Sequence, residues 1–173
     1  MKKLKLAFVA VVTGVLLFAM TACGGASGTV SSFVSAVKKG DWEKAGEYVV
    51  GTLDLSSYEN ESSDEIVSYI YQKAAKSFSY SVESTSETED DDGNVTAATI
   101  KISYEGYSGL EVLANYKIKC LAGSDSTKST ANDAFDDVGE STGSLTVAVI
   151  YNEDDGWLME AASAIALVAV IWF

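Results

Sequence analysis

Acidic side chains are the most concentrated chemically active groups in this 173-residue chain. They form two runs, ETEDDDGN at 87–94 and NEDDG at 152–156. An EF-hand calcium loop needs Asp at its first position, Gly at its sixth and a bidentate Glu at its twelfth. Aligning Gly93 with the sixth position puts Thr88 first, and aligning Gly156 puts Tyr151 first. Both runs therefore fit solvated hairpin turns better than metal sites, and we expect no metal and no cofactor.

Histidine is absent from the sequence. Its absence excludes Ser-His-Asp and Cys-His catalytic arrangements and removes the commonest zinc ligand. Proton-transfer catalysis would then need a carboxylate deep inside the fold, whereas the acids fall on predicted turns and polar helix faces. We expect a protein that is not an enzyme.

Aromatic residues offer a different chemistry, that of a small-molecule pocket with apolar walls and polar tips. At helical and strand spacing, aromatic side chains equally suit a simple hydrophobic core. Both interpretations stay open for six residues: Trp42, Tyr48, Tyr69, Phe78, Tyr80 and Trp157.

The N-terminus predicts export. Lys2, Lys3 and Lys5 precede an apolar run over 6–20. As a helix this run is about 22 Å long, shorter than a hydrocarbon core of roughly 30 Å, which is typical of a signal peptide. We therefore predict a signal peptide over residues 1–22.

The sequence MTAC resembles the lipobox of bacterial lipoproteins, in which the cysteine, here Cys23, receives a diacylglycerol and becomes the new N-terminus. The resemblance implies a lipid anchor in the bacterial cell membrane, with the domain on the extracytoplasmic face. Small residues over 23–28 predict a flexible tether. Acylation of Cys23 would leave Cys120 without a disulfide partner.

The negative net charge of the chain limits the classes of molecule that it can bind. The chain has 25 acids and 12 basic residues, all lysines. Without the three signal lysines, nine lysines remain against 25 acids, a formal net charge of −16. A surface with this charge repels the phosphate backbone of a nucleic acid. The chain also lacks arginine, the residue that most often forms specific hydrogen bonds with DNA bases. Nucleic acid is excluded as a partner, and bare anionic lipid is disfavoured.

Helices are predicted first along the mature chain. Apolar residues at i, i+3, i+4 and i+7 from Val30 predict a helix that ends at Gly40, and Asp41 predicts the cap of a second helix containing Trp42. Ser62 and Glu65 form a capping box for a third helix.

Strands follow. Alternation over 78–82 and 98–104 around Asp92-Gly93 predicts a hairpin, and 145–151 predicts a strand that turns into a last strand at Trp157. Two segments are less regular. Residues 109–122 fit a helix that buries Leu110, Leu113, Ala114, Ile118 and Leu121, and they also fit a strand. Residues 123–144 predict a mobile loop with one helical turn over 132–138, anchored by Phe135 and Val138.

The tail at 161–173, AASAIALVAVIWF, carries no charge and must be buried. As a helix it is about 20 Å long, too short to span a bilayer. It either enters the fold, as a final strand or a helix, or lies shallowly in the membrane surface. The strand-prone residues Val168, Val170, Ile171 and Trp172 favour a strand inside the fold.

TVSSFVSAVKKGDWEKAGEYV (29–49) and the Asp-Gly-Trp at 155–157 resemble a family of bacterial lipoproteins. Their uncharacterised domain has the nuclear transport factor 2-like, cystatin-like cone fold and is sometimes grouped with lumazine-binding-like domains. The resemblance implies an α+β domain over 29–173, in which N-terminal helices pack in a curved antiparallel sheet. It also favours a helix over 109–122. The apolar tail departs from the family pattern.

The function implied by this resemblance is non-catalytic binding, with an unidentified protein or small molecule of the envelope as partner. A small-molecule carrier with an apolar pocket in the cone is the alternative, and an enzyme of the cone fold is a third class. Ligand identity and oligomeric state lie beyond the sequence.

Overall fold

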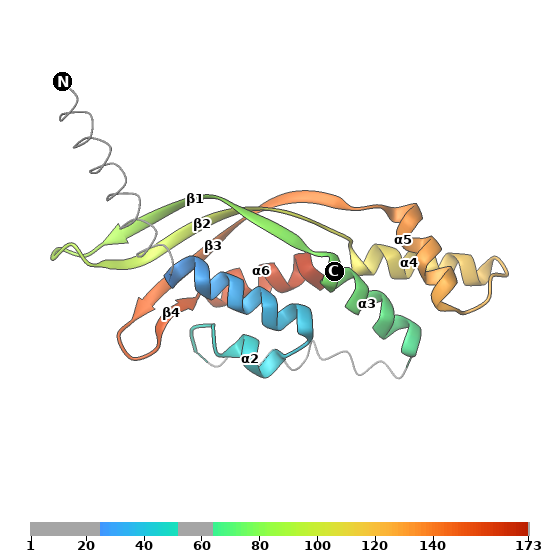
Figure 1. The fold of residues 1–173 in the computed structure, drawn as a ribbon, viewed down its shortest axis with the longest axis horizontal. Coiled ribbons are helices and arrows are strands. Elements are labelled where there is room, and N and C mark those ends of the chain that lie inside the picture. Colours follow the sequence, from blue (N-terminus) through green and yellow to red (C-terminus); the bar gives the residue numbers. More distant parts are fainter. Residues whose placement is uncertain (1–24, 52–63, 173) are drawn as a thin grey trace, which may run out of the picture.

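A four-stranded antiparallel sheet arches over a layer of helices in the computed structural model, which describes residues 25–51 and 64–172 (Figure 1). The chain is therefore an α+β protein with an open sheet. Its elements, in order, are a helix over 25–39, α2 (Trp42–Gly46), α3 (Glu65–Ser77), β1 (Ser79–Glu89), β2 (Val95–Gly106), α4 (Gly109–Leu121), α5 (Lys128–Val138), β3 (Ser141–Asn152), β4 (Gly156–Met159) and α6 (Ala161–Trp172).

The sheet is a meander in the order β1-β2-β3-β4. Its inner face buries Ile100 opposite Val147 and Ala98 opposite Val149. The alternate residues of the same strands, such as Thr99, point away from the helices and are exposed. The antiparallel pairing of β1 with β2 confirms the predicted hairpin, although Val82 of β1 is 44% exposed. The alternation in β3 confirms the predicted strand over 145–151.

The predicted helical corner is confirmed. Val30, Phe33 and Val37 are buried on one face of the N-terminal helix. Gly40 ends the helix with a φ of +72°, a conformation that glycine adopts without a steric penalty. The Asp41 carboxylate then caps α2 by accepting a hydrogen bond from the main-chain N–H of Lys44 at 3.1 Å.

The start of the third helix differs from the prediction. Asp64 caps α3, because its carboxylate accepts from the main-chain N–H groups of Ile66 and Val67. Ser62, the predicted cap, lies outside the described residues. The helix itself is confirmed and buries Ile70 and Ala74.

The flexible tether predicted over 23–28 is wrong from Gly25 onward, because 25–28 already belong to the N-terminal helix. Ala26 is fully buried, and the Thr29 hydroxyl donates to the Trp157 carbonyl oxygen at 3.0 Å. A Cβ on Gly25 would collide with the Trp157 indole. The small residues therefore serve close packing of the helix against β4. Cys23 lies outside the described residues.

The two irregular segments are both helical. Residues 109–121 form α4, capped by the Ser108 side chain, which accepts from the Glu111 main-chain N–H. The mobile loop predicted over 123–144 is wrong, because it contains the eleven-residue helix α5, capped by Thr127. Its buried face consists mostly of small residues, Thr130, Ala131 and Ala134 beside Phe135, and so carries little hydrophobic signal.

The tail enters the fold, as predicted, but as helix α6 rather than the expected strand. Leu167, Val168 and Ile171 are buried, and a helix brings them onto one face. The Trp172 ring is tilted against Trp42 at 5.2 Å and stacks on Tyr71 at 5.9 Å, both measured between ring centroids. Tertiary packing outweighs the strand propensity of the segment. Within the described residues, no helix combines the length and apolarity needed to cross a membrane.

Candidate functional site

Two of the six aromatic residues predicted as core or pocket are core. Trp42 is buried against Trp172. Phe78 is buried at the start of the sheet, with its ring 6.3 Å from Tyr80 and 5.8 Å from Tyr104. Their side chains stabilise the fold.

The other four aromatic residues are half-buried and lie apart. The Tyr69 hydroxyl donates to the Asn132 side-chain oxygen at 2.7 Å, and the Trp157 ring meets Tyr151 edge to face at 5.5 Å. Tyr48 and Tyr80 line two different hollows on either side of the N-terminal helix. Each hollow that these described tyrosines line contains only one of the six residues.

Helix α4 exposes most of the face that its sequence predicts to be buried. Leu110 is 55% exposed, Ile118 65% and Leu121 89%, and Ala114 between them is exposed as well. The buried face is instead formed by Val112, Leu113 and Tyr116. Periodicity could not find this arrangement, because the helix has apolar residues on both faces.

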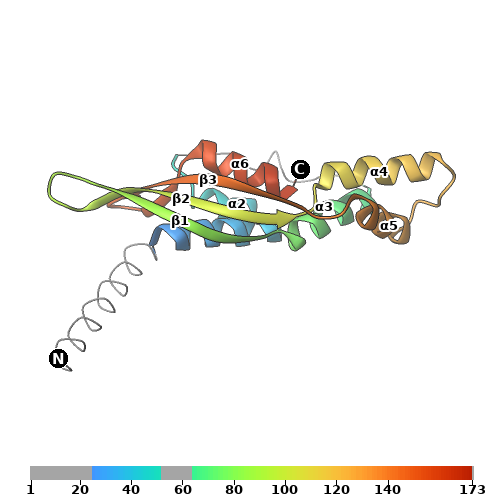
Figure 2. The same cartoon turned by 90° about the horizontal axis from the view of Figure 1, so that it is seen from above.

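The exposed face of α6 is also apolar. Ala162, Ile165 and Ala169 are exposed, and α6 contains no charged residue. The N-terminus of α4 abuts the C-terminus of α6, since a Cβ on Gly109 would lie 2.5 Å from the Trp172 carbonyl oxygen. The two helices follow one another along one edge of the molecule (Figure 2).

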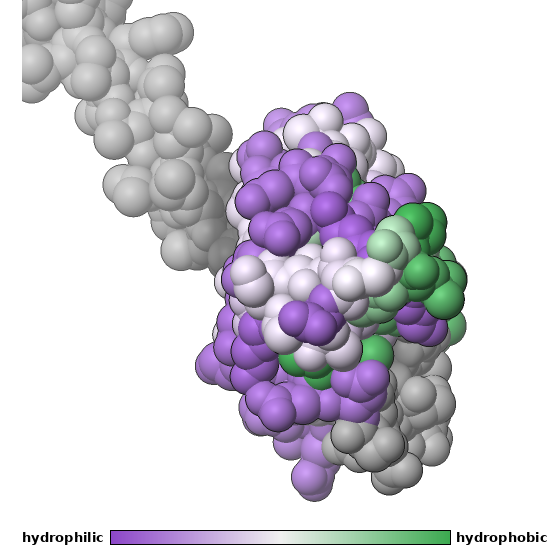
Figure 3. Space-filling model, turned by 90° about the vertical axis from the view of Figure 1, so that its right-hand side faces the viewer, coloured by the Kyte–Doolittle hydropathy of each residue, from purple (hydrophilic) through white to green (hydrophobic). Residues whose placement is uncertain are grey.

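We call the exposed apolar residues of these two helices the α4–α6 strip; they are Leu110, Ala114, Ile118, Leu121, Ala162, Ile165 and Ala169. Seen from the α4 and α5 end, the surface shows a hydrophobic patch along one side, next to mostly polar residues (Figure 3). Together the two helices have 25 residues, so the strip is about 37 Å long at 1.5 Å per residue.

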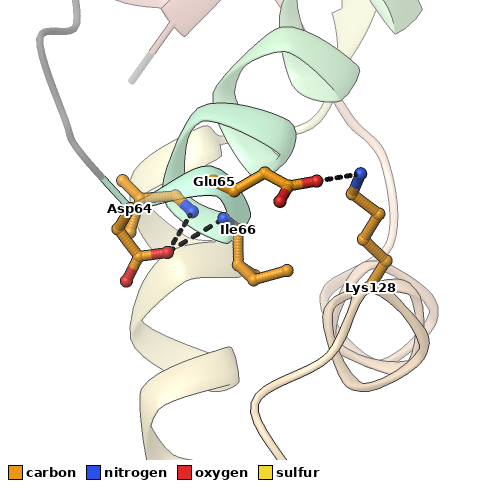
Figure 4. A network of polar contacts seen from close by, with 5 residues as sticks. Asp64, Glu65, Ile66 and Lys128 are labelled. Atoms are coloured by element: carbon orange, nitrogen blue, oxygen red, sulfur yellow. Dashed lines mark hydrogen bonds and ion pairs between the residues drawn. The ribbon is translucent and has the colours of Figure 1, made fainter.

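A small polar network ties α5 to α3 at this end of the molecule (Figure 4). The Lys128 ammonium lies 2.5 Å from the Glu65 carboxylate. Their hydrogen bond lowers the pKa of Glu65 and raises that of Lys128. Both side chains are more than half exposed, so the pair contributes little to stability.

Candidate chemistry is sparse in the part of the chain that the structure describes. It contains no cluster of three or more His, Cys, Asp or Glu residues able to hold a metal ion. Cys120 is half-buried, with a free thiol. The buried polar residues of the described ranges are Thr29, Thr130 and Ser163, each of which hydrogen-bonds main chain. These hydroxyl groups therefore serve the fold.

Comparison with known proteins returns no matching family model, no matching curated protein and no matching solved structure.

Proposed function

We propose that this chain is a lipid-anchored, non-catalytic interaction domain on the extracytoplasmic face of a bacterial cell membrane. The basic N-terminus, the short apolar run and the MTAC sequence support attachment through Cys23. Among the described residues, the buried threonine and serine hydroxyl groups all bond main chain, which supports binding rather than catalysis. We also propose the cystatin-like cone of the nuclear transport factor 2-like group as its finer fold, supported by the curved antiparallel meander over the N-terminal helix (Figure 1).

The α4–α6 strip is the observation that carries the proposal. A strip about 37 Å long and about 10 Å wide covers about 370 Å², within the size of the largest apolar patch on a typical monomer, which is often functional. Fully exposing a leucine that could be buried costs about 1.5–3 kcal/mol. Three large side chains, Leu110, Ile118 and Leu121, are exposed on one helix face.

We propose a protein as the occupant of the strip, rather than the bilayer. Helices that lie in a membrane surface carry rows of lysine or arginine beside their apolar face. Helix α4 carries one acid, Glu111, and two lysines, Lys117 and Lys119, and Lys119 is already paired with Asp137 of α5. Helix α6 has no lysine and follows directly on Glu160. With a mature net charge of −16, the domain is also repelled by anionic lipid.

The position of the strip supports the same choice. The N-terminal helix begins against β4, whereas α4 lies at the opposite end of the long axis (Figure 1). Gly24 alone separates Cys23 from Gly25, the first described residue of the helix, so the two Cα atoms are at most about 7 Å apart. A lipid on Cys23 would therefore hold the β4 end at the membrane and leave α4 free to meet a partner.

Photo-crosslinking tests this function in the source bacterium. Ile118 in the strip and, as the control, Thr99 on the exposed sheet face are each replaced by p-benzoylphenylalanine in the full chain. We expect a discrete protein adduct from position 118 and none from position 99. A lipid adduct alone at 118, or the same adduct from both positions, would contradict the proposal.

The anchor is tested separately with Cys23→Ser, which should move the protein from the membrane to the soluble fraction or leave unprocessed precursor. Fully processed mutant protein that still sediments with membranes would refute lipid attachment at Cys23.

A further inference from the structure

Lysines are concentrated at one place in this acidic domain. Four of the nine lysines that follow Cys23 line two adjoining hollows beside the N-terminal helix: Lys38, Lys39, Lys44 and Lys76. Among the described residues, the only acid in the lining of either hollow is Asp41, which caps α2. A chain with 25 acids thus presents a locally cationic surface on a different part of the molecule from the α4–α6 strip.

The two hollows lie on opposite sides of Lys39 and share the hydroxyl groups of Ser31 and Ser35. The larger hollow, about 560 Å³, lies between the N-terminal helix, Lys76 of α3 and Tyr80 of β1. The smaller, about 360 Å³, lies between the N-terminal helix and α2. Because they share one wall, we treat them as one feature, the lysine groove.

The lysines of the groove differ in their existing partners. Lys44 pairs with Glu47, and the Lys38 ammonium donates to the Phe78 carbonyl oxygen at 2.6 Å, which uses one of its three N–H groups. Lys39 and Lys76 are exposed and take part in none of the hydrogen bonds and ion pairs found between described side chains. Both ammonium groups are therefore available to a ligand.

We propose that the lysine groove binds a phosphate group. In the larger hollow, three ammonium groups and the hydroxyl groups of Ser31 and Ser35 offer hydrogen-bond donors around one space. A phosphate monoester carries a charge of about −1.5 to −2 and three strong acceptor oxygens, whereas a carboxylate carries one charge and two oxygens. The doubly charged group neutralises more of the lysine charge and uses more of the donors.

Near a membrane, the phosphate group that binds the groove can belong to a soluble compound or to a lipid headgroup. The test uses full-length protein in neutral detergent micelles and measures binding by microscale thermophoresis. One arm titrates sodium tripolyphosphate, and the other titrates short-chain phosphatidic acid, whose headgroup is a phosphate monoester, with phosphatidylcholine as the background. Binding in the first arm alone identifies a soluble ligand, and binding in the second arm alone identifies a lipid.

The test variant is Lys39→Gln/Lys76→Gln, and the matched control is Lys101→Gln/Lys117→Gln, which changes the net charge equally on other surfaces. We expect the test variant to lose about tenfold in affinity per lysine, about 1.4 kcal/mol each, and the control to stay within about twofold of wild type. Equal losses in both variants, an unchanged test variant, or no binding of wild type to either probe would overturn the proposal. Thermal unfolding of each variant checks that the fold is intact.

Discussion

Replacing Trp172 by alanine should be one of the most destabilising single changes in this chain. The indole is buried between Trp42 and Tyr71, and its N–H lies 3.4 Å from the Val37 carbonyl oxygen. It thereby joins α6 to α2, to α3 and to the N-terminal helix. Truncation of a buried tryptophan costs about 3–5 kcal/mol. Domains are stable by only about 5–15 kcal/mol, so this change would remove about a fifth or more of the total free energy of unfolding.

Urea titration followed by circular dichroism measures the loss, and thermal unfolding should show a fall in Tm of about 6–20 °C, since 1 kcal/mol shifts a domain of this size by about 2–4 °C. Tyr151→Ala is the matched control, because its ring is half-exposed and should cost less than about 1 kcal/mol. Trp172→Phe should retain most of the packing and lose less than Trp172→Ala. A loss below about 1 kcal/mol for Trp172→Ala would mean that α6 does not pack as described.

Two further changes test the local packing and the hairpin. Gly109→Ala should destabilise the protein by about 1–3 kcal/mol in urea titration, because the new Cβ would lie 2.5 Å from the Trp172 carbonyl oxygen and 2.8 Å from the Tyr71 ring, and a gain in stability would contradict this close approach. The pKa of Asp90 is lowered, chiefly because the main-chain N–H and side-chain amide of Asn94 donate to its carboxylate. This stabilisation of the hairpin turn is present above the ordinary aspartate pKa of about 3.9 and is lost as the pH falls through the lower folded value. NMR chemical shifts of the Asp92 and Asn94 amides should therefore titrate together below about pH 4, and Asp90→Asn should remove that titration; amide shifts that do not move would refute it.

The sequence predicts most of the architecture where a local signal coincides with the tertiary environment. The N-terminal helix has large apolar residues at helical spacing, and Gly40 and Asp41 mark a stop and a start, so its boundaries follow from local chemistry. The hairpin is equally clear, because one strand face is buried and the turn contains a glycine with positive φ at Gly93. These elements need no knowledge of the rest of the fold.

The sequence predictions are wrong where the burial of a residue depends on tertiary contacts between distant segments. Alanines give α5 its buried face, and small side chains carry little periodic signal. Strand-prone residues form α6, because a helix brings Leu167, Val168 and Ile171 onto the core face. The six aromatic residues are individually well described as core or half-buried groups, but which of them lie beside a hollow depends on contacts between distant segments. The sequence does not predict the lysine groove, because Lys38 and Lys39 are already explained as favourable positive charges near the C-terminus of a helix.

The ambiguity of residues 109–122 has a physical cause that also bears on function. A helix that packs on one face only alternates apolar and polar residues with a period of 3.6, which identifies its buried side. Helix α4 places Val112, Leu113 and Tyr116 against the protein and Leu110, Ile118 and Leu121 outward, so both faces are apolar and its hydrophobic periodicity is weak. The outward face carries the larger aliphatic side chains and therefore gives the stronger signal for a core. A helix that is buried once by its own fold and once by a partner would have this sequence pattern, which is why the surface proposed as an interface is predicted by the sequence to be interior.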